Sequence, residues 1–303
     1  MKVSIAINNY NYSDFIIECV NSVLEQTYKN IEIIIIDDGS TDNSMELLNK
    51  NYKDISLIKI VSKKNGGQLS AFNEAQKYIT GDIVFFLDSD DIYKVDYIEK
   101  IVKLYQDNKD IDFIFCEIER FFIDGKKEVI RKYPTNLDIG FSIISTLYSK
   151  EWVGSPTSAV SMKTNLFNKI LPIPFESDWI TRADDCLIWG SSIFGAKKYY
   201  CAEPLILYRV HETNSFYGKK FSKTYSYKRK ITIIKLFKFF TDNAGVDSNI
   251  IDLIPLEFEL RAIKDRKLLS RYLKILSFDS GFLNKFKKAR KLIRIYIKSK
   301  KLI

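Results

Sequence analysis

Three aspartates follow an apolar run and are close enough together to bind a cation. Asp88, Asp90 and Asp91 come directly after residues 83–87 in the stretch FFLDSDD. Carboxylates packed this closely repel one another, and partial burial would raise their pKa values. A hard divalent cation such as Mg²⁺ or Mn²⁺ takes oxygen ligands, usually one or two carboxylates, and leaves its other positions to water and substrate phosphates. The spacing therefore predicts a site for a metal–diphosphate complex.

A second acidic pair occupies an equivalent position in the stretch IIIIDDGSTD. Asp37 and Asp38 end a β-branched run, and Gly39 then allows the chain to turn into the next helix. Either acidic motif alone is more often a turn and helix cap than a functional site. Two such motifs at the ends of strands in one sheet favour function instead, because ligands of parallel sheets bind outside the strand carboxyl ends. Asp37 could accept hydrogen bonds from a base or ribose there.

A third pair, Asp184 and Asp185, precedes the amphipathic run CLIWG. Acidic residues at a helix N-terminus are stabilised by the helix dipole, and composition alone favours that interpretation. A metal–diphosphate site that activates a hydroxyl nucleophile also needs a general base. A carboxylate beside another carboxylate is a candidate, since its neighbour raises its pKa.

Alternating strand and helix patterns predict the elements that would position these acids. β-type runs occupy 3–7, 31–37, 56–61, 82–88 and 111–118, and helical patterns from Ser13, Gln68 and Asp96 separate them. This repetition predicts an α/β fold with a mostly parallel sheet flanked by helices. Beyond residue 118 the chain predicts a hairpin turning at Asp124–Gly125, a short turn-rich segment, a last strand from Leu205, and then helices.

Taken together, the motifs across residues 1 to about 215 are similar to those of the family 2 inverting glycosyltransferases of the GT-A fold. INNYNY resembles the first-strand loop that contacts the nucleotide, NGGQLSAFNEA resembles the Gly-rich segment before the fourth strand, and LYRVH resembles a late diphosphate or metal segment. The resemblance implies nucleotide contacts by Asn9, Tyr10, Tyr12, Asp37, Asp38, Lys63, Asn73 and Asp88. It implies metal ligation by Asp90 and His211, a diphosphate contact by Arg209 and catalysis by Asp185, although His211 could equally be a buried, satisfied side chain. Asp184 is a candidate acceptor contact, and so is Trp179, because its neighbours in ESDWITR are polar.

What the resemblance implies is a single inverting displacement. A divalent Mn²⁺ or Mg²⁺ would neutralise the leaving diphosphate of a nucleotide sugar, with UDP as the default nucleotide, while Asp185 takes the proton of a glycan or lipid-linked acceptor. Phe72 stands where many members carry Arg, so a phosphate-side cation is missing unless Lys63, Lys64 or Arg209 replaces it. We expect a glycosyltransferase domain over 1–215, with a nucleotide-sugar half at 1–117 and an acceptor half at 118–215.

The remaining residues, 216–303, are expected to form a basic helical extension. Residues 261–303 hold fifteen Lys and Arg against two Asp in a chain whose net charge is +9. Near the C-terminus, spacings of three and four place Phe282, Phe286, Ala289, Ile293 and Tyr296 on one helix face. A basic amphipathic helix is typical of membrane-surface binding, although the same stripe could pack on the protein itself or on a second subunit. No nucleic-acid module accompanies the charge.

Alternative classes are a catalytically inactive scaffold with the same sheet and a nucleotidyltransferase. A nucleotidyltransferase would carry a Gly-rich, basic loop after the first strand, where this chain has INNYNYSD. A dehydrogenase is disfavoured, because no G-x-G-x-x-G follows a strand. The chain shows no run long enough to span a membrane. We therefore expect a cytoplasmic enzyme, peripheral at the inner face of the plasma membrane and active in surface-polysaccharide assembly.

Overall fold

A computed structural model describes residues 1–122, 124–129, 131–212, 214, 219–279 and 281–301. The strands are β1 Val3–Asn9, β2 Ile31–Asp37, β3 Ile58–Ser62, β4 Ile83–Asp88, β5 Ile92–Tyr93, β6 Phe113–Phe122, β7 Lys127–Val129, β8 Leu137–Gly140, β9 Val160–Lys163 and β10 Lys198–Val210. The α-helices are α1 Ile16–Leu24, α2 Ser44–Tyr52, α3 Gln68–Gln76, α4 Tyr97–Asp107, α5 Ile143–Ser149, α6 Thr164–Ile170, α7 Asp184–Ile193, α8 Lys223–Ala244, α9 Ile254–Leu260, α10 Arg266–Ile275 and α11 Phe282–Lys301. Short 3₁₀ helices cover Thr157–Ala159, Glu176–Trp179, Ser248–Leu253 and Leu276–Phe278.

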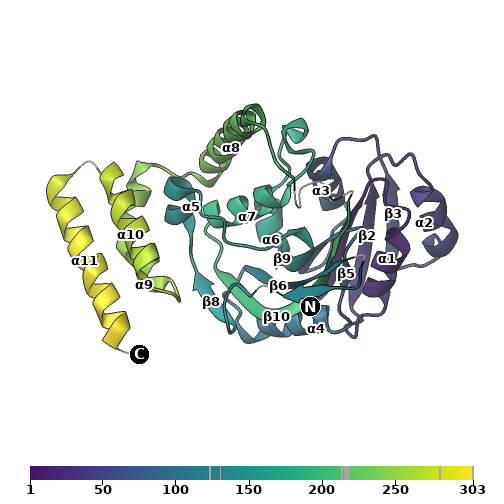
Figure 1. The fold of residues 1–303 in the computed structure, drawn as a ribbon, viewed down its shortest axis with the longest axis horizontal. Coiled ribbons are helices and arrows are strands. Elements are labelled where there is room, and N and C mark those ends of the chain that lie inside the picture. The colour runs from purple at the N-terminus through teal and green to yellow at the C-terminus, as the bar shows by residue number, and fades with distance from the viewer. Residues whose placement is uncertain (123, 130, 213, 215–218, 280, 302–303) are drawn as a thin grey trace.

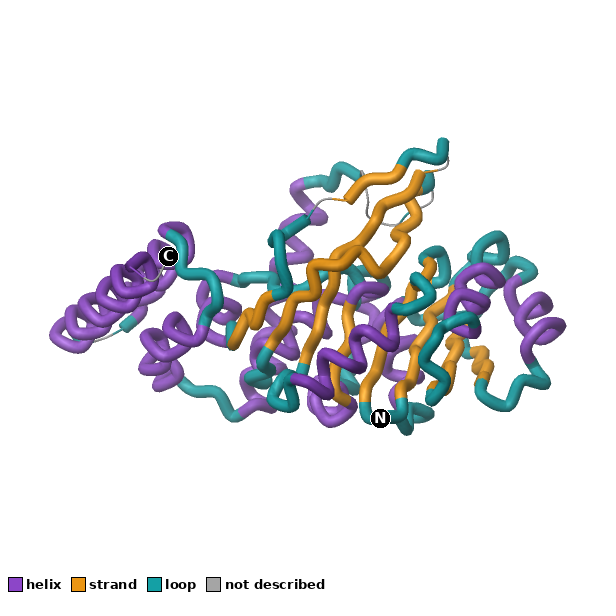
Figure 2. Tube along the Cα trace, turned by 90° about the horizontal axis from the view of Figure 1, so that it is seen from below, coloured by secondary structure: helices purple, strands orange, loops and turns teal. Residues whose placement is uncertain are grey.

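One mixed sheet runs through the body of the molecule in the order β3-β2-β1-β4-β9-β6-β10-β5, with β7 on β6 and β8 on β10 (Figures 1 and 2). The strands from β3 to β4 are parallel, as are β6 and β10. The other pairs are antiparallel. The predicted α/β sheet with flanking helices is thus confirmed, and the strands from β3 to β4 form its parallel part.

Both faces of the sheet are covered, which explains why its strands are apolar without alternation. On β4, Val84 and Phe86 point into a core with α3, α6, α7 and α8, whereas Phe85 and Leu87 point into a second core with α1, α2 and α4. Successive side chains of a strand face opposite sides, so one apolar strand serves both cores. The carboxyl end of β4 is therefore held rigidly from both faces.

The structure corrects several sequence-based details. β9 lies between β4 and β6 and is antiparallel to both, where the sequence predicted only short turn-rich structure. α1 begins at Ile16, with Phe15 at its N-cap position, later than the helix start predicted at Ser13. The preceding residues form a turn in which the Phe15 and Ile16 backbone N–H groups donate to the Tyr12 carbonyl. The last strand begins at Lys198 and passes through Pro204 with irregular register. The hairpin predicted at Asp124–Gly125 is present between β6 and β7.

The C-terminal helices α9, α10 and α11 form a layer of their own at one end of the molecule (Figure 1). Phe258, Tyr272 and Leu292 are buried there against Ile144 of α5. The buried Glu257 carboxylate joins this layer to the body, because it accepts hydrogen bonds from the Ile144 and Ser145 backbone N–H groups and from the Tyr272 hydroxyl. In the part of the chain that the structure describes, no helix is long and apolar enough to cross a bilayer.

Candidate active site

The three aspartates after β4 have different surroundings. Asp91 is buried and bonded within the protein: its carboxylate accepts from the Ser158 hydroxyl at 2.6 Å and from the Arg209 backbone N–H at 3.0 Å. The Asp90 Oδ2 atom lies 3.0 Å from His211 Nε2 and 3.3 Å from Asn214 Nδ2. Asp88 Oδ1 accepts from Gln68 Nε2 at 2.9 Å. Asp91 thus supports the loop, and Asp88 and Asp90 are the two that face the candidate site.

The surroundings of Asp88 raise its pKa, because its ionised form is costly when it is buried beside another carboxylate. Burial and the neighbouring Asp90 carboxylate raise the pKa of Asp88 to about 7. Burial likewise raises the pKa of Asp91, with Asp90 and Asp88 adding to the shift. Like charges at this distance destabilise the ionised state of the cluster unless a positive group joins it. The carboxyl end of β4 is therefore an electrostatically strained position for ligand-free protein.

β5 explains how His211 reaches Asp90 from the far end of the chain. β5 follows Asp91 at once and pairs antiparallel with Ile206 and Leu207 of β10. This pairing carries the end of β10 back across the aspartates. His211 also packs its ring against Tyr12 and Phe15, with ring centroids 5.8 and 5.0 Å apart. The sequence-predicted Asp90 and His211 are thus brought into direct contact.

Gln68 at the start of α3 is a site residue that the sequence analysis did not single out. Its Nε2 atom donates to Asp88 Oδ1 at 2.9 Å, and its Oε1 atom accepts from the Ala183 backbone N–H at 2.8 Å. A single amide thereby connects the end of β4 to the N-terminus of α7, where Asp184 lies. Its position directly after the Gly66–Gly67 pair was the only signal available in the sequence.

Asp184 and Asp185 differ sharply in what surrounds them. Asp185 is 1% exposed, and its carboxylate accepts from Trp152 Nε1 at 2.7 Å, from Arg182 at 3.0 Å and from Arg229 of α8 at 2.5 Å. Asp184 is half-buried and accepts one hydrogen bond, from the Asp185 backbone N–H. Burial and the Asp185 charge raise the pKa of Asp184 to about 7, and the Asp88 charge contributes in the same direction. Asp184 thus combines partial exposure, a single hydrogen-bond donor and a pKa near neutrality.

Polar residues at the ends of β1 and β2 line the same edge of the sheet. Asn9 Nδ2 donates to Asp37 Oδ2 at 2.9 Å, and the Ser40 backbone N–H donates to Asp37 Oδ1 at 3.0 Å. Among the described residues, the buried side-chain atoms without a hydrogen-bond partner include Asn8 Oδ1, Asn9 Oδ1 and Ser89 Oγ at the ends of β1 and β4. Buried polar groups normally have hydrogen-bond partners. Unpartnered atoms at these strand ends are therefore a sign that polar groups of a ligand bind at this edge.

Two tyrosines from the loop after β1 border this edge. Tyr10 is 46% exposed and available for stacking. Tyr12 is half-buried, and burial together with the Asp90 and Asp88 charges raises its pKa above the ordinary value. Between them, Asn11 adopts φ +57° and accepts from the Thr41 backbone N–H at 2.7 Å. The loops after β1 and β2 are thus fastened to each other around the candidate nucleotide position.

Asp38 and Lys63 hold the glycine loop that leads into α3. Lys63 Nζ lies 2.7 Å from Asp38 Oδ1, and Asp38 also accepts from the backbone N–H groups of Gly66 and Gly67. Gly67 has φ +88°, and a Cβ there would lie 2.4 Å from the Ile180 Cα atom. Only glycine permits this close approach. The loop therefore sets the spacing between α3 and the segment that precedes Asp184.

Arg209 is near the acids but is engaged by protein groups. Its Nε atom donates to the Asp90 carbonyl at 2.9 Å, and its guanidinium pairs with Glu18 at 2.5 Å. The guanidinium also lies between the Phe15 and Phe121 rings, 4.7 and 4.5 Å from their centroids. Its positive charge lies beside the acids, and its Nε–H group holds the loop at the Asp90 carbonyl.

Two predicted residues lie apart from the acids. Trp179 is 0% exposed, with the Arg229 guanidinium 3.8 Å from its ring centroid, so the predicted contact with an acceptor sugar is corrected: this ring belongs to the core. Asn73 directs its amide to the Ile173 backbone and to Glu176. The structure therefore brings Asn73 to the Ile173 segment rather than to the carboxylates.

The donor atoms at the site fit a divalent cation that substrate completes. Over the described residues, no three or more His, Cys, Asp and Glu side chains are assembled as a metal cage. Asp90 and His211 are in contact and supply an oxygen and a nitrogen ligand, a pair compatible with Mn²⁺. Cations that keep several positions for water and phosphate need few protein ligands.

Comparisons with known proteins agree with this geometry. Residues 4–167 match Glycosyl transferase family 2. An uncharacterized glycosyltransferase of Nostoc sp. is 34% identical over 221 residues, which cover 71% of this chain and 66% of that protein, so the match spans about two thirds of its length. Among solved structures, S. aureus TarS in complex with UDP-GlcNAc has a TM-score of 0.61 at 16% identity, over 98% of this chain and 89% of that chain. A mannosyltransferase from Pyrobaculum calidifontis in complex with GDP-Man and Mn²⁺ has a TM-score of 0.53 at 15% identity, over 98% and 86%.

The sheet with its flanking helices has the fold of the GT-A glycosyltransferases. The chain belongs to glycosyltransferase family 2, as its motifs indicated.

Proposed function

We propose that this protein transfers a sugar, with inversion, from a nucleotide diphosphate donor to a hydroxyl of a glycan or lipid-linked acceptor. The observation that carries the proposal is the position of Gln68. Its amide bonds to Asp88 at the end of β4 and to the Ala183 backbone N–H at the N-terminus of α7, beside Asp184. A metal–diphosphate site and a general base must lie close together for a displacement at the anomeric carbon. UDP remains the default nucleotide.

The donor would lie across the carboxyl ends of β1, β2 and β4. Asn9 and Asp37 offer hydrogen-bonding groups for the base and ribose, Tyr10 offers an exposed ring, and Asp88 borders the sugar side. Lys63 and Asp38 would act through the glycine loop that they hold. Support for this placement comes from the unpartnered buried atoms of Asn8, Asn9 and Ser89 at the same strand ends.

Asp90 and His211 would hold the Mn²⁺ or Mg²⁺ ion. A bound divalent cation would supply Lewis-acid stabilisation of the leaving diphosphate. Arg209 keeps the Asp90 backbone in position through its bond to the Asp90 carbonyl and adds positive charge nearby. Asn214 fixes the orientation of both ligands, since its Nδ2 atom lies within 3.3 Å of Asp90 Oδ2 and 3.1 Å of His211 Nε2.

For the general base, the surroundings favour Asp184 over the sequence-predicted Asp185. Three donors already occupy the Asp185 carboxylate, so removing a proton from an acceptor would require breaking one of these bonds. Asp184 accepts one hydrogen bond, and its pKa of about 7 matches proton transfer at neutral pH. Asp185 would act as a positioning residue whose ion pairs fix the N-terminus of α7.

The acceptor side includes a proposed membrane contact through α11. The predicted apolar stripe divides: Ala289 and Tyr296 pack inward, whereas Phe286 is 69% exposed and Ile293 is 42% exposed. The Phe282 side chain lies outside the described residues. With the basic residues of α11, the outward part forms a surface suited to an anionic leaflet. We propose a peripheral position at the inner face of the plasma membrane and a role in surface-polysaccharide assembly.

Isothermal titration tests the donor site. UDP, GDP, dTDP and ADP are titrated with and without Mn²⁺ into the full chain and into Asp90→Ala. We expect one nucleotide to bind only with the metal and to lose binding in the variant. If none binds in a metal-dependent way, the acids are not a working site and the inactive-scaffold alternative takes over.

A further inference from the structure

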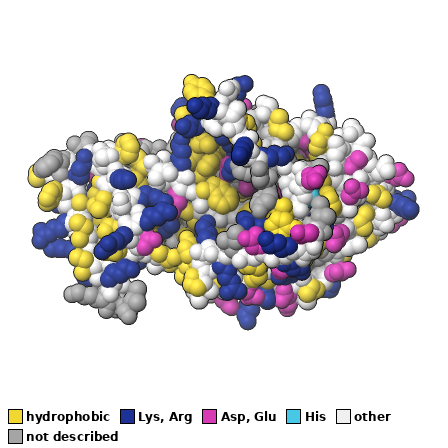
Figure 3. Space-filling model, viewed as in Figure 1, with side chains coloured by type: hydrophobic (Ala, Val, Ile, Leu, Met, Phe, Trp, Pro, Cys, Tyr) yellow, Lys and Arg dark blue, Asp and Glu magenta, His cyan; other side chains and the backbone are white. Residues whose placement is uncertain are grey.

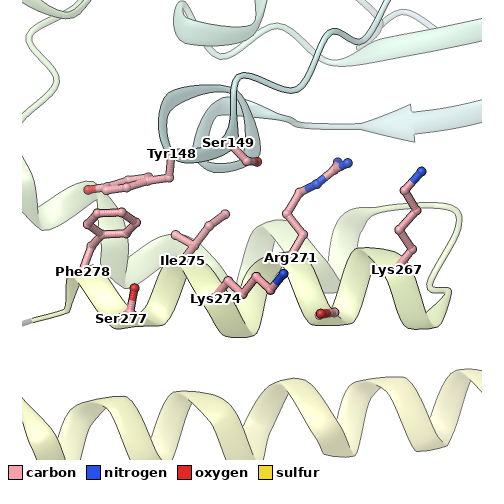
Figure 4. A pocket seen from close by; sticks show the side chains of 9 residues that line it. Tyr148, Ser149, Lys267, Arg271, Lys274, Ile275, Ser277 and Phe278 are labelled. Atoms are coloured by element: carbon pink, nitrogen blue, oxygen red, sulfur yellow. The ribbon is translucent and has the colours of Figure 1, made fainter.

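An open groove of about 500 Å³ lies between α5 and α10, away from the proposed active site (Figure 4). α5 packs against α7 on one side and against α10 on the other, so the groove is separated from Asp184 by the thickness of α5. Its walls come from the end of α5 and from one face of α10 and the turn that follows it: Tyr148, Ser149, Lys267, Ser270, Arg271, Lys274, Ile275, Ser277 and Phe278. The proposed sugar transfer uses none of these residues.

The face of α10 that lines the groove is rich in cationic and hydroxyl donors. Lys267, Ser270, Lys274 and Ser277 follow one another at spacings of three and four, which places them on one side of a helix. Arg271 lies among them and pairs with Glu151, which also pairs with Arg261. No acidic side chain lines the groove, and among the described residues Lys267 and Lys274 have no ion-pair partner. Two unneutralised ammonium groups beside three serine hydroxyls are suited to a phosphate.

The other end of the groove is apolar. Tyr148 of α5 lies over Phe278, with ring centroids 5.4 Å apart, and Ile275 lies beside them (Figure 4). Phe278 is nevertheless 66% exposed. The apolar surface continues past the groove, since Leu283 at the start of α11 is 76% exposed. A free phosphate would use the basic end alone, whereas a phosphate attached to an acyl or prenyl chain would use both ends.

The surface around the groove is also positively charged. Lys and Arg side chains, interspersed with hydrophobic ones, gather over α10 and α11 at this end of the molecule, where Asp and Glu are few on the face shown in Figure 3. Each Lys or Arg near an anionic leaflet strengthens binding by an amount that adds along the surface. A membrane facing this end would therefore present its head groups at the mouth of the groove.

We infer that the α5–α10 groove binds the phosphate head group of an anionic lipid. Lys267, Lys274 and the serine hydroxyls contact the phosphate, and Tyr148 and Phe278 contact the first carbons of the lipid chain. This inference rests on the membrane contact proposed for α11 and gives it a specific head-group site.

Sedimentation with lipid vesicles tests the groove. The full chain is mixed with phosphatidylcholine vesicles containing phosphatidylglycerol, and with phosphatidylcholine alone. Lys267→Gln/Lys274→Gln is compared with Lys50→Gln/Lys53→Gln, which removes the same charge from the α2 end of the molecule. Removing two charges that face the leaflet should weaken binding roughly 30-fold. The α2 variant should change it less than about threefold, and binding to phosphatidylcholine alone should be weak for every variant.

Further variants separate the lipid from other sources of binding. Phe278→Ser should weaken vesicle binding while leaving the affinity for inorganic phosphate unchanged. Equal losses of vesicle binding in the groove and α2 variants would mean that only overall charge matters. Unchanged vesicle binding in the groove variant, with weakened binding in Phe286→Ser, would mean that α11 makes the contact and the groove is not a site. Either result overturns the inference. Mn²⁺-dependent nucleotide binding, measured on the same samples, should be equal in all variants. Its absence in the unmodified chain would contradict the proposed transferase activity without affecting the vesicle result.

Discussion

At the residue scale, the neighbouring acids Asp184 and Asp185 make separable predictions. Asp184→Asn should lower kcat by about 10²–10⁴, the usual contribution of a general base, and should leave donor binding intact. In the unmodified enzyme, activity should rise as the pH increases through about 7, because the base works only when it is deprotonated and burial beside Asp185 holds its pKa there. Initial rates between pH 5 and 9 measure both effects.

Asp185→Asn is the matched comparison. This change removes the buried carboxylate that pairs with the Arg182 and Arg229 guanidinium groups, which destabilises the protein more than the loss of a half-buried acid with one hydrogen bond. We expect a lower melting temperature for Asp185→Asn than for Asp184→Asn. The remaining activity of Asp185→Asn should still fall at acidic pH, but at a lower pH than in the unmodified enzyme, because the Asp185 charge no longer raises the pKa of Asp184. If the fall in activity at acidic pH disappears in Asp185→Asn but persists in Asp184→Asn, Asp185 rather than Asp184 is the general base.

Gln68 makes a prediction about positioning. Gln68→Met keeps the length of the side chain but removes its bonds to Asp88 and to the Ala183 backbone. Outer-shell partners of metal-site residues typically contribute 10- to 100-fold, so we expect metal-dependent UDP binding or kcat to fall by about that factor. Gln76→Met, on the same helix, removes bonds to Asn168 and the Leu171 carbonyl and should spare activity. Equal effects of the two variants would show that Gln68 acts only through the stability of α3.

At the scale of elements, the glycine loop before α3 sets how closely α3 approaches the segment before α7. Gly67→Ala would introduce both a positive φ for alanine and a contact 2.4 Å from the Ile180 Cα atom. Gly125→Ala at the β6–β7 hairpin shares the positive φ, but its Cβ would meet nothing within 4 Å. The φ penalty is about 1–2 kcal/mol in both, so Gly67→Ala should lower the free energy of unfolding by at least twice as much, measured in urea. Equal losses would contradict a close packing role for this loop.

The elements also show how far sequence patterns reach. The parallel strands up to β4 could be predicted because each is a local apolar run, and their acids follow from the rule that ligands bind at strand carboxyl ends. β9 could not, since four residues pair antiparallel with strands distant in sequence and carry no pattern of their own. Trp179 was mistaken for a surface ring because its polar sequence neighbours do not reveal that α8 covers it. The partners of Asp185 likewise come from three separate segments.

At the scale of the whole molecule, the buried Glu257 carboxylate joins the helical end to the body, alongside the ion pairs of Glu151 with Arg261 and Arg271. Glu257→Ala leaves the backbone N–H groups of Ile144 and Ser145 and the Tyr272 hydroxyl without their acceptor. Unsatisfied buried groups cost about 1–3 kcal/mol each, so the unfolding free energy should fall by several times the effect of Glu259→Ala, an exposed change on the same helix. Hydrogen exchange should show faster opening at α5 and α10 while β1 and β4 stay protected. Because the α5–α10 groove depends on the same contact, vesicle binding should weaken while metal-dependent nucleotide binding persists. An unchanged exchange pattern would mean that the apolar contacts of Ile144 and the ion pairs of Glu151 hold the two parts together without Glu257.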